Sequence, residues 1–241
     1  MPLTAPNGVD LYYELHGSGE PLILVHGLTG DITDWRHQIA EFSRTHRVLV
    51  ADNRGHGRSA APSDAAAYTI LQMAGDIEAL AHTVGFDRFH LVGHSMGGAI
   101  AQEIALRHPS RLLSLVLEDT SFRFDGRLLQ TPPRPPRLSP ERLEEIASRL
   151  GRMSPDVLRA AWRALGTWEG TETRAASIAA RTLVVCGEYD VPAIVEGSHR
   201  LAQLIPSCAL EVIGDSAHSP QEEQPEEYNA VLRAFFERVA A

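Results

Sequence analysis

Short apolar runs alternate with segments of helical periodicity through the first half of the chain. Strand-like runs, rich in leucine and β-branched residues, fall at 9–15, 21–25, 47–51, 88–92 and 112–117. Segments with helical spacing of apolar residues fall at 33–44, 70–84 and 99–106. Because several strands are continuously apolar, helices should cover both of their faces. The pattern predicts an α/β fold with a doubly wound, mostly parallel sheet.

The alternation stops between residues 121 and 180 and then resumes with strands at 182–186 and 209–213 and helices at 193–204 and 225–239. The interruption holds a proline-rich stretch, 131–137, and two helix starts at Ser139-Pro140 and Ser154-Pro155. We expect one core domain, 1–120 and 181–241, with 121–180 as a helical cap. Two apolar stripes should pack on the core or line a pocket: Leu143, Ile146 and Leu150, then Val157, Ala161 and Leu165.

The segment Gly93–Gly98, Gly-His-Ser-Met-Gly-Gly, lies between a predicted strand and a predicted helix. A serine on such a sharp turn is lifted clear of the backbone, and the glycines remove side chains that would clash there. The helix that follows directs its positive N-terminus at the reacting group. Ser95 is therefore predicted to be a nucleophile.

A serine hydroxyl needs a base, and the base needs an orienting carboxylate. His218 and Asp190 each follow a later predicted strand, in the order serine, acid, histidine that this architecture uses. Asp119, at the end of the strand 112–117, is the alternative acid. Asp215 stands too close to His218 along the chain and is interpreted as a turn residue. No spacing typical of a metal site is present, so no metal is expected.

Acyl transfer also needs donors for the oxyanion that forms on the attacked carbonyl. We expect the backbone N–H groups of Leu28 and Met96 to supply them. Supporting roles are assigned to five further residues: His26, Gly27, Asp52, Arg54 and His94.

Composition narrows the classes of function. The 241-residue chain has a formal net charge of −9 and no lysine. The acidic balance argues against nucleic acid, and the missing lysine removes Schiff-base and P-loop chemistry. No apolar run is long enough for a membrane span, and no signal segment is visible. We expect a cytoplasmic protein without a cofactor.

Together these motifs resemble the α/β-hydrolase superfamily: His26-Gly27, Asp52–Ser59, Gly93–Gly98, Asp190 and His218. The resemblance implies a cap inserted after the sixth core strand. Ser95 stands where dehalogenases and epoxide hydrolases carry aspartate, and Ser219 where carbon–carbon bond hydrolases carry tryptophan. What remains is similar to small lid-bearing carboxylesterases and lactonases, including 3-oxoadipate enol-lactonases.

The sequence thus predicts a serine hydrolase of small-molecule esters or lactones, with an acyl-enzyme intermediate. One alternative is an enol-lactone hydrolase of an anionic substrate, held by Arg123, Arg134 or Arg137; solvated arginines on a proline-rich strap are the simpler interpretation. Others are a non-hydrolytic enzyme or a ligand receptor on the same fold. The acyl and alcohol groups and the oligomeric state stay open.

Overall fold

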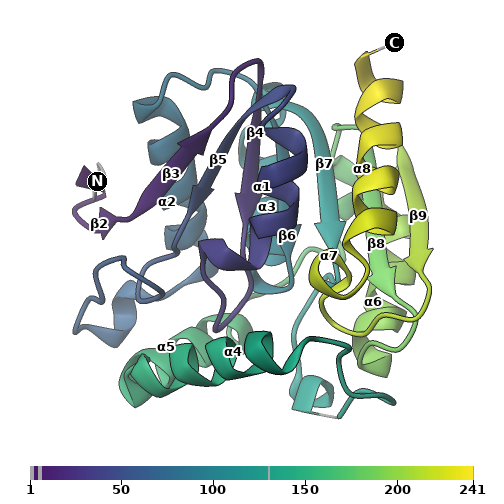
Figure 1. Cartoon of the computed structure of the whole chain (residues 1–241). Coiled ribbons are helices and arrows are strands. Elements are labelled where there is room, and N and C mark those ends of the chain that lie inside the picture. Colours follow the sequence, from purple (N-terminus) through teal and green to yellow (C-terminus); the bar gives the residue numbers. More distant parts are fainter. Residues whose placement is uncertain (1–2, 5–6, 130, 241) are drawn as a thin grey trace.

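A seven-stranded sheet forms the centre of the molecule (Figure 1), in a computed structural model that describes residues 3–4, 7–129 and 131–240. Its order is β3-β5-β4-β6-β7-β8-β9. β3 pairs antiparallel with β5, and the other neighbouring pairs are parallel. The strands are β3 Tyr13–His16, β4 Glu20–Val25, β5 His46–Ala51, β6 Phe89–His94, β7 Leu112–Glu118, β8 Thr182–Gly187 and β9 Cys208–Ile213. The predicted doubly wound sheet is confirmed.

The first predicted strand, 9–15, is wrong as a single element. It forms β2 (Asp10–Leu11), which pairs with β1 (Leu3–Thr4), and then β3. Tyr12 lies between β2 and β3. Its N–H donates to Ser59 Oγ at 2.9 Å, and its carbonyl accepts from Asp52 N–H at 2.9 Å. Because the backbone of Tyr12 bonds to the 52–59 loop, the strand is interrupted there.

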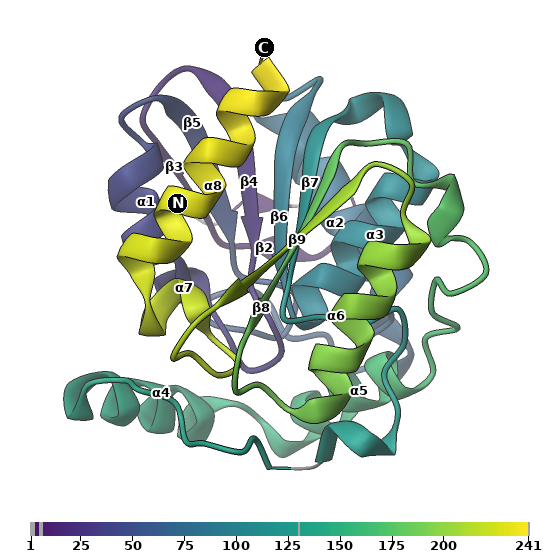
Figure 2. The same ribbon diagram turned by 90° about the vertical axis from the view of Figure 1, so that its right-hand side faces the viewer.

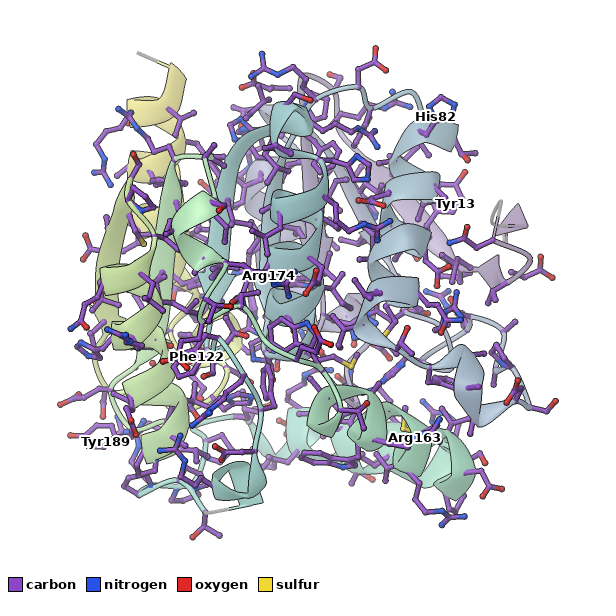
Figure 3. The ribbon with its side chains drawn as sticks, turned by 180° about the vertical axis from the view of Figure 1, so that it is seen from behind. Tyr13, His82, Phe122, Arg163, Arg174 and Tyr189 are labelled. Carbon is purple, nitrogen blue, oxygen red and sulfur yellow. The ribbon has the colours of Figure 1, made fainter. Side chains whose placement is uncertain are left out.

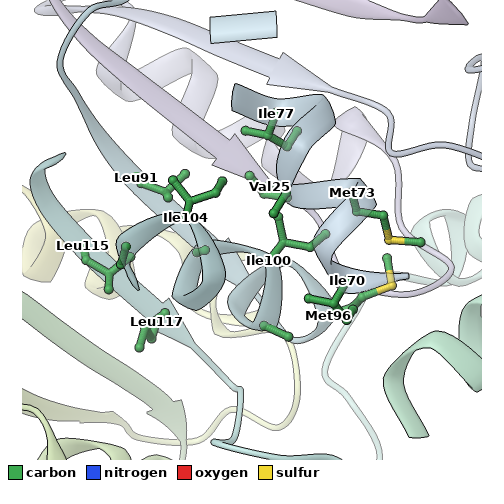
Figure 4. Close-up of a cluster of buried hydrophobic side chains, with 14 of the residues drawn as sticks. Val25, Ile70, Met73, Ile77, Leu91, Met96, Ile100, Ile104, Leu115 and Leu117 are labelled. Carbon is green, nitrogen blue, oxygen red and sulfur yellow. The ribbon is translucent and has the colours of Figure 1, made fainter. Parts of the chain in front are cut away.

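Helices cover both faces of the sheet (Figure 2). One face carries α1 (Arg36–Phe42) and α8 (Pro225–Ala240), and the other carries α2 (Ile70–Thr83), α3 (Met96–Arg107) and α6 (Pro192–Leu204). Alternate strand residues point into two cores, because side chains of a strand alternate between its faces. Figure 4 shows the core on the α2 and α3 side, where Leu91 and Ile100 are fully buried.

Shorter elements join these layers. They are η1 Ile32–Trp35, η2 Ala65–Ala67, η3 Pro109–Arg111, η4 Gly126–Leu129, η5 Ala175–Ser177 and α7 Pro220–Glu223. The predicted helix at 33–44 is η1 followed by α1. Asp31 begins η1, and its side chain accepts from Thr33 N–H at 2.9 Å.

The segment between β7 and β8 contains α4 (Pro140–Arg152) and α5 (Pro155–Gly166), which lie below the carboxyl ends of the strands in Figure 1. Ser139 and Ser154 cap the two helices as predicted. This segment follows β7, which is the fifth strand of the main sheet along the chain, whereas the resemblance implied an insertion after the sixth. Farther on, Arg174 lies over α3 (Figure 3) and donates to Glu103 at 2.7 Å.

The two helices differ in how they face the core. The α5 stripe is buried, with Val157 7% and Leu165 3% exposed, as predicted. On α4, Leu143 is 45% and Leu150 is 41% exposed, so these two residues do not pack on the core as expected. Leu150 instead lines a cavity together with Val157, which is the other outcome expected of the stripe. Arg142 is the buried residue of α4. Salt bridges to carboxylates of the core, rather than apolar contacts, therefore hold this helix.

Among the described residues, no helix combines the length and apolar character needed to cross a membrane.

Candidate active site

Ser95 occupies the sharp turn from β6 into α3. Its φ of 54° is in the left-handed region, and its N–H donates to Glu118 O at 2.8 Å. A Cβ on Gly97 would lie 2.2 Å from Val25 O, and one on Gly93 would lie 2.3 Å from Gly97 O. Only glycine permits such close backbone approach. The turn thus has the strand–serine–helix geometry that the sequence predicts.

The structure brings Ser95, His218 and Asp190 together in one line. His218, in the loop after β9, places Nε2 3.0 Å from Ser95 Oγ. Its Nδ1 lies 2.8 Å from Asp190 Oδ2. Asp190, after β8, is also held by Val191 N–H, which donates to Oδ1 at 2.6 Å. A base between a hydroxyl and a buried carboxylate is the arrangement that activates a nucleophile.

The pKa shifts of His218 and Asp190 indicate which of the two groups carries the proton. Desolvation alone would lower the pKa of His218, but the Asp190 carboxylate outweighs it and the pKa is raised. Burial alone would raise the pKa of Asp190, but the charge and hydrogen bonds of His218 leave it lowered. An ionised Asp190 therefore faces Nδ1–H of His218. The imidazole remains 39% exposed, so a substrate can reach its outer edge.

Asp119, the alternative acid, lies beside Asp190 rather than in its place. It is fully buried, and its Oδ1 accepts from Gly187 N–H at 2.9 Å. Asp119, Asp190 and His218 bring ligand atoms within 4.8 Å of one another. Burial, followed by the charge of Asp190, raises the pKa of Asp119 well above its usual value. Two carboxyl groups this close cannot both ionise, and the one that contacts His218 keeps the charge.

The loop after β4 brings two backbone donors near Ser95. Among the described residues, the N–H of Leu28 and that of Met96, the first residue of α3, find no acceptor. A Cβ on Gly27 would lie 3.0 Å from Ser95 Cβ, so the loop passes close to the serine. Thr29 follows with a φ of 65°. Both predicted oxyanion donors thus belong to segments that meet at Ser95.

The predicted supporting residues hold these loops by hydrogen bonds. His26 Nε2 accepts from Asn53 N–H at 2.9 Å, so its Nδ1 carries the proton that is donated to Gly27 O at 2.7 Å. Asp52 accepts from Ile32 N–H at 2.9 Å. Arg54 is buried and donates from Nε to Asp76 Oδ2 on α2 at 2.6 Å.

Two residues hold the His218 loop. His94 Nε2 lies 2.7 Å from the carbonyl oxygen of His218. Burial, with His218 next, lowers the pKa of His94 to about 3, so His94 is neutral and donates this bond. Glu223 Oε1 accepts from Ala217 N–H at 3.0 Å. Sequence analysis missed Glu223, although Ser219-Pro220 followed by glutamates is a helix-start signal that could have indicated it.

Arg134 of the proline-rich stretch lies at the rim of the site. Its guanidinium carbon is 4.7 Å from the ring centroid of Tyr189, which precedes Asp190 (Figure 3 labels Tyr189). Arg134 is only 20% exposed and pairs with Asp215. The interpretation of this arginine as solvated is therefore wrong. Asp215 has the turn conformation predicted for it, with a φ of 58°, and it also binds Arg137.

Comparison with known proteins identifies the family. Residues 20–161 match the family described as alpha/beta hydrolase fold. The chain belongs to this family. A protein of Variovorax paradoxus named "Putative carbamate hydrolase RutD" is 31% identical over 96% of this chain and 97% of its own length.

Two further relatives bear on the assignment. A protein of the same name from Azorhizobium caulinodans is 37% identical over 126 residues, 52% of this chain and 47% of that one; here the match spans about half the relative. A thermophilic esterase of solved structure from Thermogutta terrifontis is 29% identical to this chain. The match covers 100% of this chain and 99% of the esterase and superposes with a TM-score of 0.88. These relatives support a hydrolytic function.

Proposed function

We propose that this chain hydrolyses carboxylic esters or lactones of small molecules through an acyl-enzyme on Ser95. The observation that carries the proposal is the continuous line from Ser95 Oγ through His218 to the buried Asp190. Two further features support the proposal. The His218 imidazole is partly exposed, and the three residues lie at the carboxyl ends of parallel strands, where such sheets bind ligands.

The reaction follows from these positions. His218 Nε2 takes the proton as Ser95 Oγ attacks the carbonyl carbon, and the N–H groups of Leu28 and Met96 bind the oxyanion. The tetrahedral intermediate collapses, and the leaving alkoxide takes the proton from Nε2. Water, deprotonated by the same nitrogen, then attacks the acyl carbonyl, and Nε2 returns the proton to Ser95 Oγ as the carboxylic acid is released. Asp190 holds Nδ1–H throughout and stabilises the imidazolium.

Carbamate hydrolysis is the second candidate, because the relative that aligns with 96% of this chain is named for it. The same steps apply, with an amine or ammonia leaving in place of an alkoxide. An anionic enol-lactone has weaker support. Arg134 and Arg137 both pair with Asp215. Arg123 Nε lies 3.8 Å from Asp125 Oδ2. Each guanidinium that could bind an anionic substrate therefore already faces a carboxylate of the protein.

The first test is Ser95→Ala. With p-nitrophenyl acetate, kcat should fall on the order of 10⁴-fold or more because the nucleophile is removed. Ser148→Ala, at an exposed position on α4, is the matched control and should keep wild-type kcat. Wild-type turnover by Ser95→Ala, with the thermal midpoint unchanged, would rule the proposal out.

A substrate panel separates the candidates. p-Nitrophenyl esters of graded acyl length, neutral lactones, anionic lactones and N-substituted carbamates are compared by kcat/KM. The proposal predicts that a neutral ester or lactone ranks first, whereas a carbamate in that place would favour the second candidate. A single slow acylation without turnover on every class would favour a receptor.

A further inference from the structure

A second group of chemically reactive side chains lies at the opposite end of the sheet from Ser95. Glu20 is the first residue of β4, His46 the first of β5 and His90 the second of β6. The strand order β5-β4-β6 places the carboxylate between the two imidazoles. Glu20 is the register partner of His46, and Leu22, two residues on, is the partner of His90. The three side chains therefore share one face of the sheet.

The distances between these three side chains fit a single metal ion bound by all of them. The ligand-type atoms of Glu20, His46 and His90 all lie within 4.8 Å of one another. Glu20 Oε2 is 3.0 Å from His90 Nε2. Two ligands at the usual zinc distances and a tetrahedral angle are about 3.3–3.5 Å apart. A metal ion could therefore replace the proton between these atoms after a shift of a few tenths of an ångström.

Each imidazole is held by a hydrogen bond at its Nδ1 atom, as the second ring nitrogen of a metal-bound histidine usually is. His90 Nδ1 lies 2.7 Å from Ser114 Oγ, and His46 Nδ1 lies 2.9 Å from Thr45 Oγ1. These contacts leave the Nε2 atoms for a ligand. The ring centroid of Phe236, on α8, is 4.8 Å from that of His90 and 5.5 Å from that of His46.

The group is also reachable from solvent. A cavity of about 340 Å³ opens beside Glu20 and His46 and is also lined by Phe236 and Glu237. Glu41, Arg44 and Arg233 line it too, and Glu41 pairs with both arginines. Neutral imidazole and a carboxylate are the ligands that zinc prefers among nitrogen and oxygen donors.

We propose that Glu20, His46 and His90 form a binding site for a divalent transition metal of the zinc class, with water from the cavity completing the coordination. The site ties together the starts of three neighbouring strands and lies at the sheet edge opposite the serine. It therefore acts on stability and not on the hydrolytic reaction, and it does not depend on the proposed function. Sequence spacing could not reveal it, because the ligands are 26 and 44 residues apart along the chain (20 to 46, 46 to 90).

The test is zinc binding by the full chain after treatment with a chelator, measured by titration calorimetry and by metal analysis after dialysis. Substituting His90 would disturb the core, so exposed Glu20 and half-buried His46 carry the test. Glu20→Gln and His46→Gln should each weaken zinc binding at least tenfold. Ser114→Ala should weaken it on the order of 10-fold, as loss of a supporting hydrogen bond does.

His16→Gln is the matched control. His16 Nε2 also faces a carboxylate, Glu14 Oε2 at 2.9 Å, but Glu14 and His16 are not part of a three-ligand group. It should bind zinc as the wild type does. His218→Gln is measured in parallel, because the partly exposed imidazole of the active site could also take up zinc. This variant should keep the zinc affinity that Glu20→Gln and His46→Gln lose.

A second readout is thermal stability. Zinc should raise the melting temperature of the wild type and of His16→Gln, but not that of His46→Gln, because a ligand stabilises only the state that binds it. Equal zinc affinity in wild type, Glu20→Gln and His46→Gln would overturn the proposal, as would no zinc uptake by the wild type. Either result would leave the group as a hydrogen-bonded cluster that binds no metal.

Discussion

Asp119 and Asp190 show how one residue's neighbours decide its role. Both follow strands that end at the same edge of the sheet, so sequence position alone left two candidates for the acid. Asp190 is the carboxylate in hydrogen-bond contact with His218, whereas Asp119 bonds to the backbone of Gly187. This difference depends on side-chain direction at strand ends, which no pattern along the chain encodes. Ser95 needed no such information, because its turn is encoded by adjacent residues.

At the residue scale we predict unequal effects of two isosteric changes. Asp190→Asn should lower kcat on the order of 10³–10⁴-fold, because an amide cannot hold Nδ1–H of His218. Asp119→Asn should cost less than about tenfold, since its amide can still accept from Gly187 N–H and donate to Asp190. Steady-state kinetics with p-nitrophenyl acetate measure both. The reverse order would transfer the acid role to Asp119.

Helix α4 shows what element-level patterns predict and what they miss. Its start at Ser139-Pro140 follows from local capping chemistry and is confirmed. Its buried side was predicted from the apolar stripe and is wrong, because Arg142 and Arg149 meet carboxylates of the core. Periodicity gives the angular spacing of side chains on a helix but not the charge of the surface it meets. That surface is assembled from residues 80 to 118 positions away along the chain.

At the element scale, Arg142→Met should destabilise the protein by about 3–5 kcal/mol, because it removes the close partner of the buried Glu222 carboxylate and one of the two partners of Asp34. Arg142 Nε donates to Glu222 Oε2 at 2.9 Å, and Arg142 Nη2 donates to Asp34 Oδ1 at 2.7 Å. Arg152→Met, at an exposed position on the same helix, is the control and should change stability by less than about 0.5 kcal/mol. Urea unfolding measures both. Equal effects would show that the buried pairs do not hold α4.

At the scale of the whole molecule, one buried acid at the carboxyl edge of the sheet affects stability. Glu118, at the end of β7, is fully buried, and Tyr228 of α8 donates to its Oε2 at 2.7 Å. Burial raises its pKa to about 8. The folded protein therefore holds a proton that the unfolded chain, with an ordinary glutamate pKa of about 4.3, releases at neutral pH.

The sign of the resulting pH dependence follows from that proton. Because the folded state binds more protons, the contribution of Glu118 to the free energy of unfolding is full below about pH 4.3 and falls as pH rises toward about 8. The slope from this group is at most about 1.4 kcal/mol per pH unit. Glu118→Gln should flatten the decline between pH 5 and 8 in urea unfolding. An unchanged slope would mean that Glu118 ionises freely in the folded protein.

The inward-facing arginines of α4 have a consequence for the solvent in which the molecule works. Dissolved salt screens ion pairs, most strongly exposed ones such as Arg36 with Glu145, whereas strongly hydrated anions such as sulfate strengthen apolar burial. Ammonium sulfate should therefore tighten the apolar core and weaken the exposed ion pairs of α4. The buried pairs of Arg142 are screened much less, so they should keep α4 attached in concentrated salt.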